Sequence, residues 1–226
     1  INDILITALC RTLSWYSGSD FSAIDIEGHG REDIVGLPDV SRTAGWFTAI
    51  YPFAVRLDLK ADIGNTIIEV KEALRNVPGK GIGYGLLRYL SSDPQAEELK
   101  AYPSSGLLFN YLGVFTSGSF SSEEFSICNE LNGPERPGEA QRSHLIEINC
   151  GISDKCLNME WSYSKNIFRK ATIESLINKY KETISEIVSH CRSSDAGAFS
   201  HSDFEVFGWS PDEIDNIISK VNNSQE

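Results

Sequence analysis

The chain has 226 residues, enough to bury a full hydrophobic core in one large domain or two small ones. Hydrophobic residues make up 41% and charged residues 23%, which is ordinary for a soluble globular protein. The net charge of −12 argues against a nucleic-acid partner, because phosphates are neutralised by basic surfaces, and no apolar run approaches the roughly 20 residues that cross a bilayer.

Apolar periodicity predicts the elements of the first half of the chain. A helical repeat stops before Gly18, and the next apolar residues alternate with polar ones, as in a half-buried strand. A further helical repeat stops at Pro78-Gly79, a pair typical of turns. In chain order we predict a helix over 2–16, a strand over Phe21–Glu27, strand-like runs over Arg42–Pro52 and on to Leu59, and helices over 67–77 and Gly85–Leu90.

The second half of the chain alternates between strand and helix patterns around one polar stretch rich in serine and glycine. In chain order we predict a strand over Leu107–Leu112, a long surface loop over 116–143 with a short strand near Phe125–Cys128, a hairpin of Leu145–Gly151 and Cys156–Tyr163 with a turn over 151–155, a helix over 172–191, and a C-terminal helix capped by Ser210-Pro211-Asp212-Glu213. The predicted fold class is α/β or α+β, with helices packed on a mixed sheet.

Cysteine and histidine spacing favours neither a disulfide framework nor a metal site. The cysteines are odd in number and contain no CxxC pair, and the histidines lack ligand spacing, so we expect no metal and reduced thiols in a cytoplasmic protein. The chain opens without an initiator methionine or a charged leader, and we expect a piece of a longer protein. These residues are Cys10, Cys128, Cys150, Cys156, Cys191, His29, His144, His190 and His201.

The segment Glu27-Gly28-His29-Gly30-Arg31-Glu32 places two carboxylates, an imidazole and a guanidinium within six residues. On the strand that precedes it, Ile24 and Ile26 would face a core, while Asp25 and Glu27 face away from it. The arrangement suits acid/base chemistry, with Asp25 raising the pKa of Glu27 through repulsion between like charges. A solvated, charged strand end is the alternative interpretation.

The extended geometry could continue beyond Glu27. In that case His29 and Arg31 would share the face of Glu27, with same-face neighbours roughly 6.5 Å apart. Gly28 and Gly30 would lie on the opposite face, where the missing side chains allow a backbone or a ligand to approach closely.

Three further segments are unusual in composition. Pro78–Gly85 carries four glycines at alternate positions, but it follows a helix and matches neither GxxxxGK[ST] nor GxGxxG, so we predict a tight turn and not a nucleotide site. Arg42–Thr48 and Phe109–Gly113 are denser in aromatic and polar residues than core strands require. Each of these two, taken alone, is more often core than site.

Taken together, five segments occur in one order: Asn2–Ala8, Glu27–Glu32, Arg42–Pro52, Pro78–Gly85 and Phe109–Gly113. In this order they resemble the C-terminal half of the epimerization domain of non-ribosomal peptide synthetases, which are relatives of the condensation domains. The resemblance spans the whole chain, including the tail from Ser202, and departs chiefly at Ala44, where the family usually carries Val. The HHxxxDG motif of the family's N-terminal lobe is missing, since the sequence contains no His-His pair.

The resemblance implies one lobe of a two-lobe enzyme with a chloramphenicol-acetyltransferase-like fold and an active site in the channel between the lobes. The implied reaction inverts the α-carbon of an aminoacyl or peptidyl thioester, from L to D, by acid/base proton transfer. The implied partners are the N-terminal lobe of the same domain and a peptidyl carrier protein domain, whose phosphopantetheine carries the substrate. No cofactor of its own, no metal, no nucleic acid and no membrane are expected.

Seven residues map onto polar or aromatic positions of the family's site. By resemblance Glu27 is the base or acid, and the chain alone should be inactive because removal and return of a proton on opposite faces is easiest with two groups. Two alternatives stay open: a condensation-type lobe that forms a peptide bond, which the segment Glu27–Glu32 argues against, and a non-catalytic module that docks a carrier domain. The other residues are Asn110, Tyr111 and Arg31 for the thioester oxygen, and His29, Trp46 and Tyr84 for contacts with the substrate.

Overall fold

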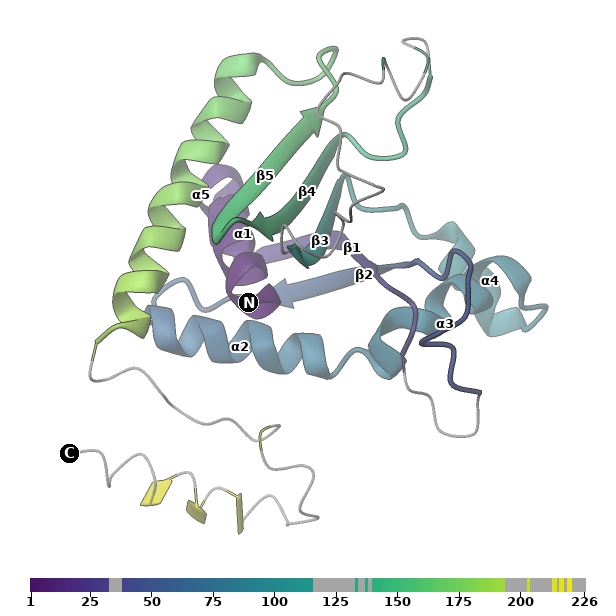
Figure 1. Ribbon diagram of the computed structural model, residues 1–226, viewed down its shortest axis with the longest axis horizontal. Coiled ribbons are helices and arrows are strands. Elements are labelled where there is room, and N and C mark those ends of the chain that lie inside the picture. The colour runs from purple at the N-terminus through teal and green to yellow at the C-terminus, as the bar shows by residue number, and fades with distance from the viewer. Residues whose placement is uncertain are drawn as a thin grey trace, which may run out of the picture. The chain divides into compact units, whose positions relative to one another are not determined.

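Five strands form one mixed sheet in this protein, and helices precede, interrupt and follow them along the chain (Figure 1). The computed structural model describes residues 1–32, 38–115, 133, 137, 140–193, 203, 213, 214, 216, 217, 219 and 220. Contacts between residues divide the chain into two compact units. The first comprises Ile1–Ala23, Phe53–Gly81 and Lys170–Glu226, and the second comprises Ile24–Pro52 and Ile82–Arg169. The predicted class, helices with a mixed sheet, is confirmed.

The strand order is β2-β1-β3-β4-β5. Strand β3 runs parallel to both β1 and β4, and β4 and β5 form the predicted antiparallel hairpin. The hairpin turn is shorter than predicted: Asp154 and Lys155 have φ of 51° and 63°, as in a two-residue type I′ turn that follows the twist of the strands. The bounds are Phe21–Gly28 (β1), Ala49–Arg56 (β2), Leu107–Phe115 (β3), Ile146–Ser153 (β4) and Cys156–Tyr163 (β5).

Three helices of the first unit pack on one another: α1 (Asn2–Ser17), α2 (Ile63–Arg75) and α5 (Lys170–Cys191). Each lies where the apolar periodicity predicts a helix, and α1 ends at Gly18, whose φ of 70° suits a residue without a Cβ. The Tyr180 hydroxyl donates to the Leu5 carbonyl at 3.2 Å and joins α5 to α1. Their buried apolar side chains include Leu5, Ile6, Leu9, Val70, Ile173, Leu176 and Ile187.

Short helical segments follow α2. The predicted turn at Pro78-Gly79 is confirmed as a 3₁₀ segment, η1 (Pro78–Gly81), in which Gly79 has φ of 52°. Helix α4 was not predicted from the sequence, because no apolar stripe marks it; the Asp93-Pro94 pair with Glu97, typical of a helix N-terminus, could have indicated it. The segments after η1 are α3 (Ile82–Gly85), the π-helical η2 (Leu86–Leu90) and α4 (Pro94–Ala101).

The predicted strand over Arg42–Pro52 is wrong in its first half, since β2 begins at Ala49. The physical reason lies in the backbone carbonyls, which face a cation and not a neighbouring strand. The Arg31 guanidinium donates to the carbonyls of Val40, Thr43 and Gly45, the last two at 2.7 and 3.1 Å.

Some predicted segments lie outside the described residues, namely the short strand near Phe125–Cys128, most of the loop over 116–143, and the capping residues Ser210-Pro211-Asp212. The described positions of the predicted C-terminal helix, from 213 to 220, are helical, and Ile214 is buried. Among the helices that the structure describes, none combines the length and the apolar character needed to cross a bilayer.

Candidate functional site

The sheet strands of the second unit have one apolar and one polar face. Ile26, Phe109 and Ile148 lie side by side on β1, β3 and β4, and each is at most 2% exposed. Side chains alternate along a strand, so the residues between them share the opposite face. That face carries Asp25, Glu27, Asn110, Glu147 and Asn149.

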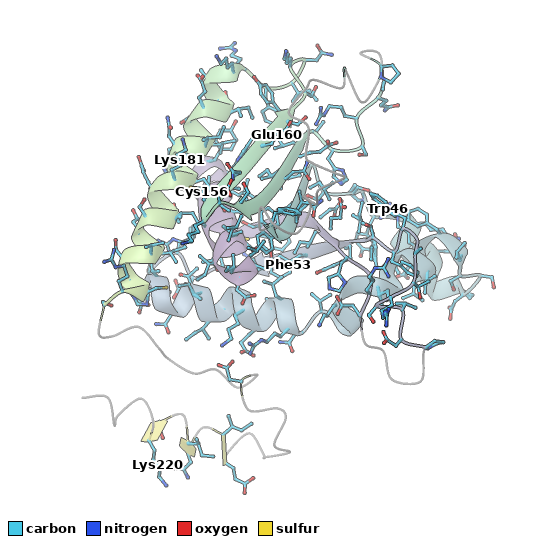
Figure 2. The ribbon with its side chains drawn as sticks, viewed as in Figure 1. Trp46, Phe53, Cys156, Glu160, Lys181 and Lys220 are labelled. Carbon is cyan, nitrogen blue, oxygen red and sulfur yellow. The ribbon has the colours of Figure 1, made fainter. Side chains whose placement is uncertain are left out.

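One row on the polar face brings the central predicted residue next to two amides. Glu27 on β1 lies opposite Asn110 on β3, and Asn110 lies opposite Asn149 on β4, in strands about 4.8 Å apart. The row continues to Glu160 on β5, which is exposed and labelled in Figure 2. We define the candidate site as Glu27, Asn110 and Asn149. Sequence reasoning missed Asn149, because only the strand register brings it to Asn110.

Glu27 is half-buried, and burial raises the pKa of its carboxyl above the ordinary value. The direction of this shift agrees with the sequence-based prediction, but its cause does not, since repulsion from Asp25 was held responsible. A carboxylate removed from water is a stronger base than one at the surface, because the charged form loses solvation. A raised pKa suits an acid/base residue, and that role of Glu27 stays a prediction here.

The strand pattern predicted that Asp25 faces away from the core formed by Ile24 and Ile26, but Asp25 is itself buried, with 5% of its area exposed. The His144 Nε2 donates to the Asp25 carboxylate at 2.9 Å, and both side chains are buried, with 7% and 8% of their areas exposed. His144 lies in the segment before β4, 119 residues away in sequence, so no local pattern could have indicated the pair.

The backbone leaves the extended conformation after Gly28, so the condition under which His29 and Arg31 would share the face of Glu27 is not met. Strand β1 ends at Gly28, and Gly30 has φ of 65°, a left-handed conformation that glycine adopts without strain. A Cβ at Gly30 would overlap the Phe47 carbonyl oxygen. The close approach of another backbone, expected from the glycines, is thus confirmed, and it is the segment before β2 that approaches.

Arg31 turns towards that segment and not towards Glu27. In addition to its three carbonyl acceptors, its guanidinium lies 4.3 Å from the centroid of the Phe47 ring, a cation–π distance. The contact of Arg31 with a thioester oxygen stays a prediction; in the structure its donors hold the segment before β2.

The three residues that we predicted to contact the substrate differ in their neighbours and in their exposure. His29 is mostly exposed, with Nε2 3.2 Å from the Glu32 carboxylate. Trp46 is 87% exposed on the segment before β2 (Figure 2). Tyr84, on α3, accepts a hydrogen bond from Arg88, which raises the pKa of that guanidinium. None of the three stands in the row of Glu27, and their contact with substrate stays a prediction.

Tyr111 lies on the opposite face from Asn110, because the two are adjacent in a regular stretch of β3. It pairs with Cys150, which is buried, whereas Asn110 pairs with Asn149. Gly113 has φ of 90°, and the register of β3 with β4 shifts only after Tyr111. Of the two residues, the register therefore brings Asn110 to Glu27.

For the acid/base reaction that the resemblance implies, we expect Asn110→Ala to slow turnover of the complete domain by about 10²-fold or more, since loss of one amide donor to a developing oxyanion typically costs that much. Tyr111→Phe serves as the matched comparison from the opposite face and should keep turnover within about threefold. Rates with a carrier-bound aminoacyl thioester, together with melting temperatures, measure both. A slow Tyr111→Phe variant with an unchanged melting temperature would return Tyr111 to the site.

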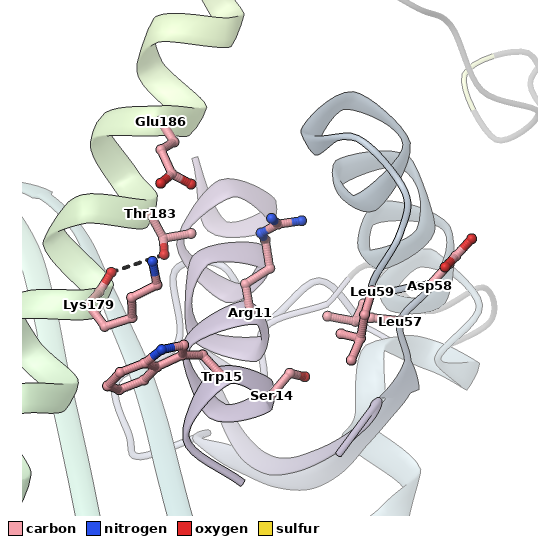
Figure 3. Close-up of a pocket in the computed structure, with 9 residues that line it drawn as sticks. All are labelled: Arg11, Ser14, Trp15, Leu57, Asp58, Leu59, Lys179, Thr183 and Glu186. Atoms are coloured by element: carbon pink, nitrogen blue, oxygen red, sulfur yellow. Dashed lines mark hydrogen bonds between the residues drawn. The ribbon is translucent and has the colours of Figure 1, made fainter. Parts of the chain in front are cut away.

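An open pocket with a volume of about 260 Å³ lies in the first unit (Figure 3). Basic and acidic side chains are balanced in its lining, and no residue predicted for the site is among them. Within the part of the chain that the structure describes, no three His, Cys, Asp or Glu side chains are grouped to hold a metal ion. The pocket is lined by Arg11, Ser14, Trp15, Leu57, Asp58, Leu59, Lys179, Thr183 and Glu186.

Known proteins are similar to this chain in both sequence and fold. The family model described as "Condensation domain" matches residues 1–206. The chain belongs to the condensation domain family. The family-level resemblance read from the sequence motifs is thereby confirmed.

Relatives of this condensation-family chain are large peptide synthetases. It is 40% identical over 221 residues to part of a linear gramicidin synthase from Brevibacillus parabrevis, and 38% identical over 229 residues to bacitracin synthase 3 of Bacillus licheniformis. Each match covers 97% of this chain and 3% of the relative, so the chain spans a small part of either protein.

In one solved structure the match covers a larger share of the other chain than it does in the two synthases. The crystal structure of the epimerization domain from the third module of tyrocidine synthetase B is 34% identical, with a TM-score of 0.75. The match covers 84% of this chain and 42% of that one. The predicted architecture, one lobe of a condensation-type fold, is confirmed by this likeness.

Proposed function

We propose that this chain is the C-terminal lobe of an epimerization domain, which inverts the α-carbon of a carrier-bound aminoacyl or peptidyl thioester. The observation that carries the proposal is the half-buried Glu27 carboxylate in register with the Asn110 amide on an otherwise apolar-backed sheet. The likeness to the tyrocidine synthetase epimerization domain supports it.

In this proposal the ionised Glu27 removes the α-proton of the thioester. The electron pair of the C–H bond moves to the carbonyl, and negative charge develops on the oxygen. The side-chain amides of Asn110 and Asn149 are hydrogen-bond donors that suit this charge. A second group, supplied by the N-terminal lobe, returns a proton to the other face of the planar intermediate.

The raised pKa of Glu27 sets the expected pH dependence. A base must be ionised to act, so the rate falls as the pH drops through the pKa of Glu27. Because burial raises that pKa, the acidic limb of the pH–rate profile should lie above the ordinary carboxyl range of about 4.3.

Two other functions are consistent with the family. A condensation-type lobe would contribute to peptide-bond formation, which the family description favours. A docking module would hold a carrier domain without chemistry, for which the exposed Trp46 is suitable. The substrate is carried on the partner's phosphopantetheine in all three cases, and the partners proposed are the N-terminal lobe and the carrier domain.

Deuterium wash-in distinguishes the three functions. A carrier-bound aminoacyl thioester is incubated in heavy water with the complete two-lobe domain, and the α-position and its configuration are analysed. We expect incorporation and D product with the complete domain, and no exchange above background with the 226-residue chain alone, because the second acid/base group is missing.

Peptide-bond formation without α-exchange would assign the condensation function, and carrier binding without either reaction would assign the docking function. Robust exchange by the 226-residue chain alone would show that its own residues suffice, and would contradict the two-lobe mechanism.

A further inference from the structure

The buried pair of Asp25 and His144 stands two residues from Glu27 on the same face of β1. Same-face neighbours on a strand are roughly 6.5 Å apart, close enough for one carboxylate to act on another. A carboxylate as buried as Asp25 is costly unless a partner compensates its charge. The contact with His144 at 2.9 Å supplies such a partner.

We propose that His144 is a positioning residue for the reaction of Glu27: its ring, at ion-pair distance from the Asp25 carboxylate, compensates that carboxylate and so shields the base from a second negative charge. This inference rests on the proposed function and adds to it a residue outside the site. His144 acts through Asp25 and does not touch the substrate.

The hydrogen bonds of His144 hold its ring at both nitrogens. Nε2 donates to Asp25, and Nδ1 lies 3.2 Å from the Ser143 hydroxyl. A hydroxyl rotates to accept from a protonated Nδ1 or to donate to an unprotonated one. The Arg142 guanidinium fixes the same segment, because its Nε donates to the His144 carbonyl at 3.2 Å.

Other charges around the pair do not replace His144. Arg142 is engaged with the Glu147 carboxylate at 3.2 Å and with Ser162, so these two charges compensate each other. Arg88 is bound to Tyr84 and the Tyr102 carbonyl. Asp25 is the last of the causes that raise the pKa of Arg88, after the Tyr84 hydrogen bond. Charged and titratable groups on the surrounding elements include Glu27 (β1), Tyr51 (β2), Glu147 (β4), Arg142 (before β4), and Arg88 and Tyr89 (η2).

The test is the pH dependence of kcat/KM for epimerization by the complete domain. In His144→Gln the amide keeps a hydrogen bond to Asp25 but not the charge. We expect the acidic limb assigned to Glu27 to move up by roughly one pH unit, the scale for like charges about 6.5 Å apart at a partly screened site. The double variant Asp25→Asn/His144→Gln carries no charge in the pair, and its limb should return to within about 0.3 units of wild type.

If His144→Gln does not fold, because the buried Asp25 carboxylate has lost its partner, a second comparison still tests the proposal. In the Asp25→Asn background no anion remains, so adding His144→Gln should change the rate by less than about threefold. A further loss of tenfold or more would overturn the proposal, because His144 would then act directly. A purely structural pair predicts a lower melting temperature with an unmoved limb in His144→Gln, and that result overturns the proposal as well.

Failure of this inference is distinguishable from failure of the proposed function. An inactive Glu27→Gln variant with an unmoved limb in His144→Gln removes only the role of His144. An active Glu27→Gln variant removes the assignment of Glu27, and the role of His144 with it.

Discussion

Glu27→Gln, made in the complete two-lobe domain, should lose epimerization by about 10²-fold or more. Gln has nearly the same shape but no basic carboxylate, and loss of a positioned acid/base group typically costs 10²- to 10⁴-fold. The rate of D-product formation from a carrier-bound aminoacyl thioester, or of α-deuterium wash-in, measures the effect. Activity within a few-fold of wild type would falsify the assignment of Glu27.

The same variant should not be destabilised, which separates a lost base from a lost fold. Because burial raises the pKa of folded Glu27, its ionised form weakens the fold near pH 7, and this penalty disappears once the carboxyl is protonated in both states. Glu27→Gln should therefore melt at least as high as wild type at pH 7, and the difference should shrink towards about pH 4.

Glu160→Gln is the matched control for the same chemical change. Glu160 lies in the same row of the sheet, on β5, but its side chain is exposed and no chemistry is proposed for it. We expect activity and melting temperature within error of wild type. A loss at Glu160 as large as that at Glu27 would mean that the assay responds to the charge of the polar face and not to one base.

Gly30→Ala should cause a large loss of stability, since two penalties act at this position. An alanine with φ of 65° costs about 1–2 kcal/mol, and its Cβ would also overlap the Phe47 carbonyl oxygen, which is backbone and cannot rotate away. Overpacking adds about 1–3 kcal/mol. At about 2–4 °C per kcal/mol for a chain of this size, the melting temperature should fall by roughly 4–20 °C.

Gly18→Ala is the control for the backbone penalty alone. Gly18 has φ of 70°, and a Cβ built there has no heavy atom within 4 Å. Its melting temperature should fall by no more than about 8 °C, and by less than that of Gly30→Ala under identical conditions. Equal losses in the two variants would show that the segment before β2 moves aside at little cost. The packing of Phe47 against the end of β1 would then contribute little stability.

Local sequence patterns were sufficient to predict several helices and strands of this protein, and its family. The helices at both ends of the first unit follow from 3.6-residue periodicity, and β1 follows from the alternation of Ile24 and Ile26 with polar residues. The order of five motifs indicated the family, which the match to residues 1–206 shows. Alternation along a strand likewise requires Asn110 and Tyr111, which are adjacent, to lie on opposite faces. These properties depend on neighbours in sequence, so the sequence determines them.

Tertiary structure decided what depends on distant neighbours. The register of β1 with β3 places Asn110 opposite Glu27, and the register of β3 with β4 places Asn149 opposite Asn110. The Arg31 guanidinium binds backbone carbonyls of the segment before β2, which its place in the motif did not indicate. Asp25 was expected to face away from the core. Instead it is buried in a hydrogen-bonded pair with His144, which is 119 residues away in sequence. Hydrogen bonds and burial act through space, so the environment of each charged group in the candidate site was set by the fold and not by its place in the motif.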